Sequence, residues 1–183
     1  MSDLPRRIFR FANKYFMVPL FRLGLGPFFG NPLTGYIMVL KTIGRKTGVV
    51  RYVPVNYTIH KGDVYCISGW RKVADWYKNL HANPEIEIML PGGTLFARME
   101  EICDPDEKCL VARQVLKNAG VAGFFEGYNP AAISDEELKQ KAADLPVLRF
   151  QPLGVGNGPS DAGGWAWIWS FVTTAILIVL LLQ

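Results

Sequence analysis

The chain has 183 residues, of which 50% are hydrophobic and 20% are charged, and its formal net charge is +4. This length suits a single domain, and this composition excludes a wholly disordered chain. The positive excess is too small to indicate a nucleic-acid-binding protein. Only two histidines are present and the three cysteines form no C-x-x-C pair, so neither a histidine-rich metal site nor a thiolate zinc site is expected.

The first segment is predicted to be a helix that begins at Ser2 or Asp3. Apolar residues recur at helical spacing, while basic residues, among them Arg7 and Arg10, share another face. Pro19 is expected to kink or end this helix. A basic amphipathic helix can lie on an anionic membrane surface or pack its apolar face on its own domain, and the pattern fits both.

Strand patterns dominate from residue 36 to residue 150. Six strands, joined mostly by hairpin turns, are predicted at Tyr36–Ile43, Val49–His60, Val64–Ser68, Glu85–Leu90, Thr94–Ile102 and Val147–Gln151. Helices are predicted at Val73–Asn83, from the capping residue Asp104 to about Gly120, and from Ser134 onward. This order fits an antiparallel β-barrel with helices, a mainly β member of the α+β class, better than a parallel sheet.

The end of the chain has a different composition. Residues Trp165–Leu182 carry no charge, and as a helix at ~1.5 Å rise per residue they would span roughly 27 Å. Three tryptophans at the start of the run suit a water–lipid interface. No polar stripe marks a solvent face, which disfavours a core-packed helix. We therefore expect a single-pass C-terminal transmembrane anchor that tethers the protein to the cell membrane, with its domain on the cytoplasmic side.

These patterns divide the chain into four parts. They are an N-terminal amphipathic helix at 1–26, a cofactor-binding barrel at 27–152, a Gly-rich linker at 153–164 and the membrane anchor at 165–182. The linker composition is typical of a flexible tether. No internal repeat is visible.

The stretch with the densest candidate chemistry is Thr42–Gly48, which is followed by Arg51. Its two glycines let backbone N–H groups turn toward a ligand, Thr42 and Thr47 supply hydroxyls, and three cations lie close together. Such a stretch can bind phosphates or carboxylates, and it can equally be a solvated hairpin tip. The spacing of its glycines excludes a Walker phosphate-binding loop.

Two stretches further along the chain agree with a ligand site. Gly69, which follows a predicted strand, would let a planar ligand approach the backbone closely. Trp76 and Asn79 stand three residues apart, so a helix places them on one face. Asn79 needs a hydrogen-bond partner if it is buried, and the barrel backbone is as suitable a partner as a ligand.

Four motifs together resemble the deazaflavin-dependent nitroreductase family. They are Leu40-Lys-Thr-Ile-Gly-Arg-Lys-Thr-Gly48, Arg51-x-x-Pro54, Ser68-Gly-Trp70 and Asp75-Trp-Tyr-Lys-Asn-Leu-x-Ala-Asn-Pro84, within a match over residues 33 to 103. The resemblance implies a split antiparallel β-barrel of the FMN-binding kind that binds the deazaflavin coenzyme F420. It also implies an oxidoreductase that transfers a hydride to quinones, nitroaromatics or unsaturated ring compounds, often beside a membrane.

The resemblance also assigns site residues. Arg45, Lys46, Thr47 and Arg51 would hold the phosphate and acidic tail of the coenzyme, and Pro54 would line its ring. The full predicted cofactor site consists of Lys41, Thr42, Arg45, Lys46, Thr47, Arg51, Pro54, Ser68, Gly69, Trp76 and Asn79. The predicted substrate contacts are Tyr15, Asn56 and Tyr128. No catalytic acid, nucleophile or metal is required, because the coenzyme carries the hydride.

One position departs from the family pattern. Asn56 stands where the best-known nitroreductases of the family carry an aromatic residue, which argues against nitroimidazole reduction. Two other interpretations keep the same barrel: it binds FMN, haem or a fatty acid in place of the deazaflavin, or it is a non-catalytic protein that binds or shields a cofactor. The expected partners are a small-molecule hydride acceptor and membrane lipid, with no nucleic acid, and the chain could form a homodimer.

Overall fold

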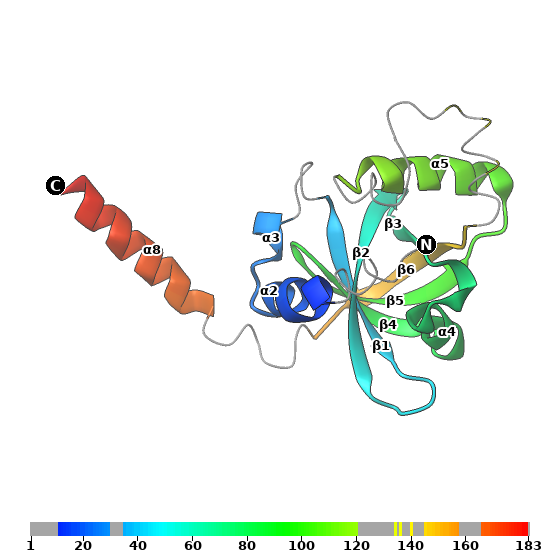
Figure 1. Cartoon of the computed structure of the whole chain (residues 1–183), viewed down its shortest axis with the longest axis horizontal. Coiled ribbons are helices and arrows are strands. Elements are labelled where there is room, and N and C mark those ends of the chain that lie inside the picture. The colour runs from blue at the N-terminus through cyan, green and yellow to red at the C-terminus, as the bar shows by residue number, and fades with distance from the viewer. Residues whose placement is uncertain are drawn as a thin grey trace.

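The computed structural model describes residues 11–29, 35–120, 134, 136, 140, 145–157 and 166–182. Among these residues, six antiparallel strands form a closed barrel in the order β1-β2-β3-β6-β5-β4 (Figure 1). The strands are β1 (Ile37–Ile43), β2 (Val50–His60), β3 (Asp63–Ile67), β4 (Glu85–Leu90), β5 (Gly93–Glu101) and β6 (Val147–Val155). The predicted six-stranded antiparallel barrel of the α+β class is confirmed.

One face of each strand fills the barrel interior. Met38 and Leu40 of β1, Ile88 of β4 and Phe150 of β6 are fully buried in a single core cluster. Because side chains alternate along a strand, Val39 and Lys41 of β1 point to the outside of the barrel. The register of β1 with β2 therefore also decides which residues of β2 face outward.

Helices cover two parts of the barrel. The 3-10 turn η2 (Arg71–Val73) leads into α4 (Asp75–Ala82), which packs Tyr77 and Leu80 into the interior cluster. Outside the barrel, α5 (Pro105–Lys117) packs against β3 and β6. Asp104 caps α5 as predicted, because its carboxylate accepts a 2.8 Å hydrogen bond from the Glu107 N–H.

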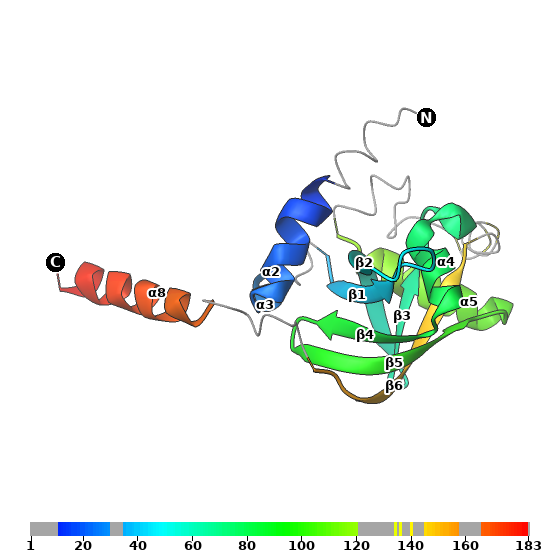
Figure 2. The ribbon, with the colours of Figure 1, turned by 90° about the horizontal axis from the view of Figure 1, so that it is seen from below.

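The N-terminal segment covers the outer face of β1 and β2 (Figure 2). It consists of the π-helical turn η1 (Asn13–Met17), α2 (Val18–Arg22) and α3 (Gly26–Phe29), and Phe21 of α2 packs on Val39 of β1. The helix does not end at Pro19: the chain is helical from residue 11 to Arg22, and Pro19 lies at the start of α2, directly after the π-helical turn. The predicted start of the helix at Ser2 or Asp3 lies outside the described residues.

The last helix corrects the prediction of a membrane anchor. α8 (Ala166–Leu181) has 16 residues, which at ~1.5 Å per residue reach about 24 Å, short of the ~30 Å hydrocarbon core of a bilayer. Within the residues that the structure describes, no helix is long and apolar enough to cross a membrane. The predicted transmembrane helix at 165–182 is therefore wrong, and the predicted location at the cell membrane is contradicted with it. Trp165 itself lies outside the described residues.

β6 is longer than its sequence pattern indicates. It continues past Gln151 to Val155 and pairs with β5 through an irregularity between Phe96 and Ala97. Pro152 and Gly154 interrupt the alternation of apolar and polar residues that would mark a strand here. A proline is nevertheless tolerated beside such a bulge. Most of the helix predicted from Ser134 lies outside the described residues.

Two glycines with positive φ allow a matched test of the fold. Gly35 (φ +91°) and Gly62 (φ +90°) have nearly the same φ, but of these two only Gly35 is a position where a Cβ would meet other atoms, 2.8 Å from the Ala119 carbonyl oxygen and from Asn56 Nδ2. Gly62→Ala should lower the free energy of unfolding by about 1–3 kcal/mol through backbone strain. Gly35→Ala should lower it further, as measured by urea denaturation. Equal losses of unfolding free energy in the two variants would show that the atoms around Gly35 can move to accommodate a Cβ without destabilising the protein.

Candidate functional site

The tip of the β1–β2 hairpin is a tight turn that requires both glycines of its motif. The Gly48 N–H donates to the Gly44 carbonyl oxygen at 2.7 Å, and the Gly44 N–H donates to that of Val49 at 2.9 Å. A Cβ on Gly44 would lie 2.8 Å from Thr47 Oγ1 and 3.3 Å from Arg51 Nε, and Gly48 has a φ of +66°. The side chains of Thr47 and Arg51 therefore lie against the turn.

Arg45 joins this turn to α4. Its Nη2 lies 3.0 Å from Asp75 Oδ1, and its Nη1 donates to the Asp75 carbonyl oxygen at 3.2 Å and to Asn79 Oδ1 at 2.9 Å. The Arg45 backbone N–H donates to the same Asn79 oxygen at 3.2 Å. Asn79 is only 3% exposed, so the hairpin supplies the partner that its burial requires.

The turn carries more positive than negative charge. The hydrogen bond from the Arg45 guanidinium, together with its charge and those of Lys78 and Lys46, holds the pKa of the Asp75 carboxyl below its usual value although desolvation opposes the shift. Lys46, Lys78 and Arg51 are exposed. Within the described part of the chain, none of these three forms an ion pair. An anion reaching this surface would therefore meet cations that are not already neutralised.

The first half of β2 is an edge strand. Val50–Asn56 pairs with β1 along one side, but β2 pairs with β3 only from Tyr57 to His60. No strand of the described chain pairs with the other side of Val50–Asn56. Pro54 fits this position, since a proline is tolerated where no ladder hydrogen bond is needed. Backbone N–H and C=O groups along this edge have no strand partner.

The chain leaves the barrel wall at Ser68, immediately after β3. The Ser68 N–H donates to the Pro146 carbonyl oxygen at 2.9 Å, and its hydroxyl donates to the Arg71 carbonyl oxygen at 2.9 Å. Continuing the β2–β3 register beyond Tyr57 and Cys66 would bring Ser68 opposite Val55. The turn at Ser68 and the exposed Gly69 therefore begin beside the unpaired half of β2.

Other predicted residues lie on the outer face of the barrel. Lys41 points outward, and its Nζ lies 2.6 Å from Oε2 of Glu87, whose side chain is 4% exposed. Asn56 shares this outward face and donates from Nδ2 to the Tyr36 carbonyl oxygen at 3.4 Å. Tyr15 lies in the π-helical turn η1 and is exposed. Tyr128 lies outside the described residues.

The remaining predicted residues are part of the barrel's packing. Thr42 is fully buried and its hydroxyl donates to the Arg51 carbonyl oxygen at 3.3 Å, which braces the two strands of the hairpin. Trp76 is half-buried against the interior cluster. The structure thus brings Thr42, Arg45, Lys46, Thr47, Arg51 and Asn79 together at the hairpin and α4, and leaves Lys41 apart from them.

Two residues of the sequence motifs, Asp75 and Tyr77, make contacts that the sequence analysis did not predict. Asp75 lies one helical turn before Asn79, and this spacing, which puts both on one face, was the available signal. Tyr77 on the opposite side of α4 donates to Glu101 Oε2 at 2.5 Å, and the same oxygen lies 3.1 Å from His81 Nε2. These contacts fix α4 to the end of β5, which no local pattern could indicate.

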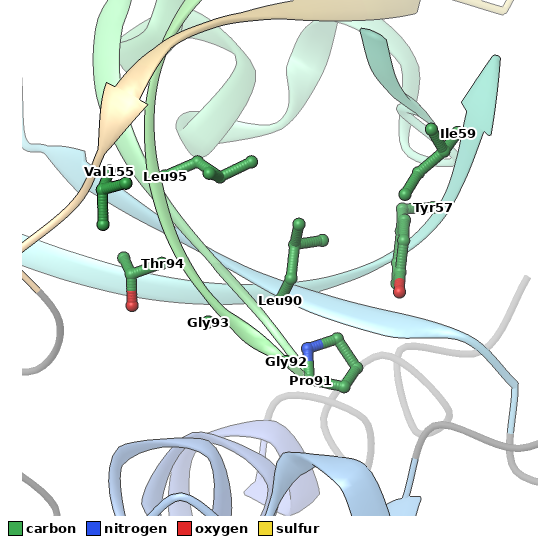
Figure 3. Close-up of a pocket in the computed structure, with 9 residues that line it drawn as sticks. All are labelled: Tyr57, Ile59, Leu90, Pro91, Gly92, Gly93, Thr94, Leu95 and Val155. Carbon is green, nitrogen blue, oxygen red and sulfur yellow. The ribbon is translucent and has the colours of Figure 1, made fainter. Parts of the chain in front are cut away.

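A separate pocket of about 440 Å³ opens at the other mouth of the barrel (Figure 3). Its mostly apolar lining comes from the end of β2, the β4–β5 hairpin and the end of β6. The lining residues are Tyr57, Ile59, Leu90, Pro91, Gly92, Gly93, Thr94, Leu95 and Val155. None of the predicted cofactor residues contributes to it.

Comparison with known proteins gives one family match. The model of the family described as F420H(2)-dependent quinone reductase matches residues 22–126, which is more than half of the chain. This match includes the hairpin, all of β2, the Ser68 turn and α4. No curated protein matches the chain.

Several solved structures are similar in fold. An F420-H2 dependent reductase (FDR-A) is 24% identical with a TM-score of 0.42, covering 63% of this chain and 93% of its own. A structure described as a domain-swapped dimer has the same identity and TM-score and is covered to 79%. A 5-nitroimidazole antibiotic resistance protein from Bacteroides thetaiotaomicron is 14% identical with a TM-score of 0.44, covering 66% of this chain and 74% of its own. At these TM-scores the likenesses support no functional argument.

The bond between Tyr77 and Glu101 generates a test of how α4 is held. Burial, with the Glu101 carboxylate, raises the pKa of Tyr77 to about 12, so the unfolded chain loses this proton first, near its ordinary value of about 10. The stabilisation is therefore complete below about pH 10 and is lost as the pH rises toward 12. Urea unfolding should show Tyr77→Phe less stable than wild type by about 1.5–3 kcal/mol at neutral pH. The difference should shrink above about pH 10, and a constant difference would contradict the raised pKa.

Proposed function

The chain belongs to the F420H(2)-dependent quinone reductase family, and from this premise we propose that it transfers a hydride from reduced coenzyme F420 to a quinone-like acceptor. Family membership makes the protein an F420-dependent oxidoreductase with coenzyme F420 as its cofactor. The coenzyme supplies the hydride when bound. The residues of this chain therefore have to bind the coenzyme, orient its ring and bring the acceptor to it.

The hairpin fits the anionic tail of this cofactor. Lys46 and Arg51 are exposed and, among the described residues, have no ion-pair partner, while Thr47 adds a hydroxyl beside them. Phosphate and carboxylate oxygens form charge-assisted hydrogen bonds with such groups. A coenzyme tail with a phosphate and several carboxylates would use more of these cations than FMN, which has one phosphate. The cluster thus favours F420 over the FMN alternative.

The observation that carries the proposal is the unpaired half of β2. A flavin-like ring has amide groups at its edge, and a strand edge offers the matching backbone N–H and C=O groups. The hairpin cations lie at the start of this edge and the Ser68 turn lies beside it. We therefore assign Pro54 and its neighbours to one side of the ring, with Ser68 and Gly69 on the other.

The acceptor would approach from the N-terminal helix. Tyr15 lies in a π-helical turn, a conformation that is frequent at functional sites, and η1 and α2 cover the outer face of β2 that carries Asn56. The amide of Asn56 can donate to a quinone carbonyl oxygen. Nitroaromatic and unsaturated ring compounds remain alternative acceptors, and a homodimer remains a proposal.

Removing single hairpin cations tests the cofactor site. Lys46→Ala or Arg51→Ala should weaken F420 binding by roughly ten- to a hundredfold, because one charge-assisted bond contributes about 1.5–3 kcal/mol. The loss should be smaller at high salt, since part of it is screened Coulomb attraction. The turnover number at saturating coenzyme should fall much less, because contacts to the tail act equally in the ground and transition states.

The matched control removes a positive charge elsewhere. Lys117→Ala, on the exposed end of α5, should leave F420 binding unchanged. F420 and FMN should be compared in the same fluorescence titration. Tight FMN binding without F420 binding, or normal F420 binding by both hairpin variants, would overturn the assignment.

A further inference from the structure

We propose that Arg45 is a positioning residue: together with Asp75 and Asn79 it forms a latch that fastens the hairpin to α4 and so presents Lys46 and Arg51 to the anionic tail. This inference rests on the proposed function, because the tail is that of coenzyme F420. It assigns to Arg45 a different role from the direct contact that the family resemblance implies. The latch is defined by these three residues.

The guanidinium of Arg45 is already engaged. Two of its nitrogens make three contacts with α4, to the Asp75 carboxylate, the Asp75 carbonyl oxygen and the Asn79 amide oxygen. A phosphate or carboxylate that bound Arg45 head-on would have to displace these acceptors. Asn79, which is 3% exposed, would then keep only the Arg45 backbone N–H as a partner for its amide oxygen, and the loss of a hydrogen bond to a buried polar group is costly.

The two halves of the latch differ in importance. The carboxylate of Asp75 is 83% exposed, and a solvent-exposed ion pair stabilises little. Asn79 is buried and accepts from both the backbone N–H and the side chain of Arg45. The contact with Asn79 therefore does most of the fastening, and it constrains the hairpin backbone as well as the side chain.

The element to which the hairpin is fastened is itself fixed. Leu80 of α4 is fully buried in the barrel interior, and Tyr77 is bonded to Glu101 of β5. The latch thus ties an exposed turn to the core through one helix. Lys46, the next residue after Arg45, takes part in no ion pair among the described residues, so fixing Arg45 leaves its neighbour available to a ligand.

A double-mutant cycle distinguishes a latch from an arrangement in which Arg45 and Asn79 each contact the coenzyme independently. Arg45→Gln and Asn79→Ala should each weaken F420 binding about tenfold in a fluorescence titration, and the double variant should also lose about tenfold, because both changes break one unit. Arg45→Lys, which keeps the charge but not the planar fork, should lose as much as Arg45→Gln. A hundredfold loss in the double variant, or near-normal binding by Arg45→Lys, would overturn the proposal.

A second readout needs no coenzyme. Trypsin cleaves after Lys46, and Asn79→Ala should be cut there faster than wild type because its hairpin is unfastened. Asn79→Asp retains an acceptor for Arg45 and should be cut at the wild-type rate. Thermal unfolding identifies any general loss of stability in Asn79→Ala. Equal cleavage of Asn79→Ala and wild type would overturn the latch, whereas a failure of the wild type to bind F420 would overturn only the proposed function.

Discussion

The feature on which the rest of this structure depends is the early separation of β2 from β3. β2 has eleven residues and β3 has five, so the two strands pair over only four residue pairs. The chain leaves β3 at Ser68, where hydrogen bonds to Pro146 and Arg71 fix the turn, and it then forms α4. One departure thus produces both an unpaired edge on β2 and the helix to which the hairpin is bonded. The proposed position of the coenzyme ring depends on the unpaired edge of β2, and that of its tail depends on the bonding of the hairpin to α4.

α4 connects the stability of the barrel to the geometry of the hairpin. One side of it packs Tyr77 and Leu80 with the strands, and the side that faces the hairpin presents Asp75 and Asn79 to Arg45. Hydrophobic burial fixes the helix, and polar contacts then position an exposed turn that has little packing of its own. In such a site the hairpin does not have to be held by packing of its own. Burial in the core stabilises α4, and the latch then fixes the position of the hairpin relative to α4.

The sequence predicted the barrel well because its strands are alternating or continuous apolar runs, and glycine, proline or aspartate lies close to the end of each run. It failed at the end of the chain: the predicted membrane span at 165–182 has eighteen residues, but the helix α8 has 16. It also ended β6 early, because Pro152 and Gly154 interrupt the pattern while backbone pairing with β5 continues. Residue types at the site were available from the motifs, and Asn79 was expected to need a partner. The sequence did not indicate that Arg45 would be this partner, since Arg45 and Asn79 are 34 positions apart.

Register explains why cations close in the sequence have different roles. Lys41 lies on the outer face of β1, and Glu87 of β4 is its direct neighbour in the ladder, so its charge is compensated by a carboxylate that is itself buried. Arg45 lies in the turn and is compensated by α4. Lys46 and Arg51 form no ion pair within the described chain, although the charge of Lys46 also acts on the Asp75 carboxyl. A phosphate or carboxylate is attracted most strongly to a cation that has no ion-pair partner, so under the proposed function Lys46 and Arg51 are the charges that meet the coenzyme tail. The basic residues of one motif therefore cannot all be equivalent, and it is the pairing across strands and to α4 that distinguishes them.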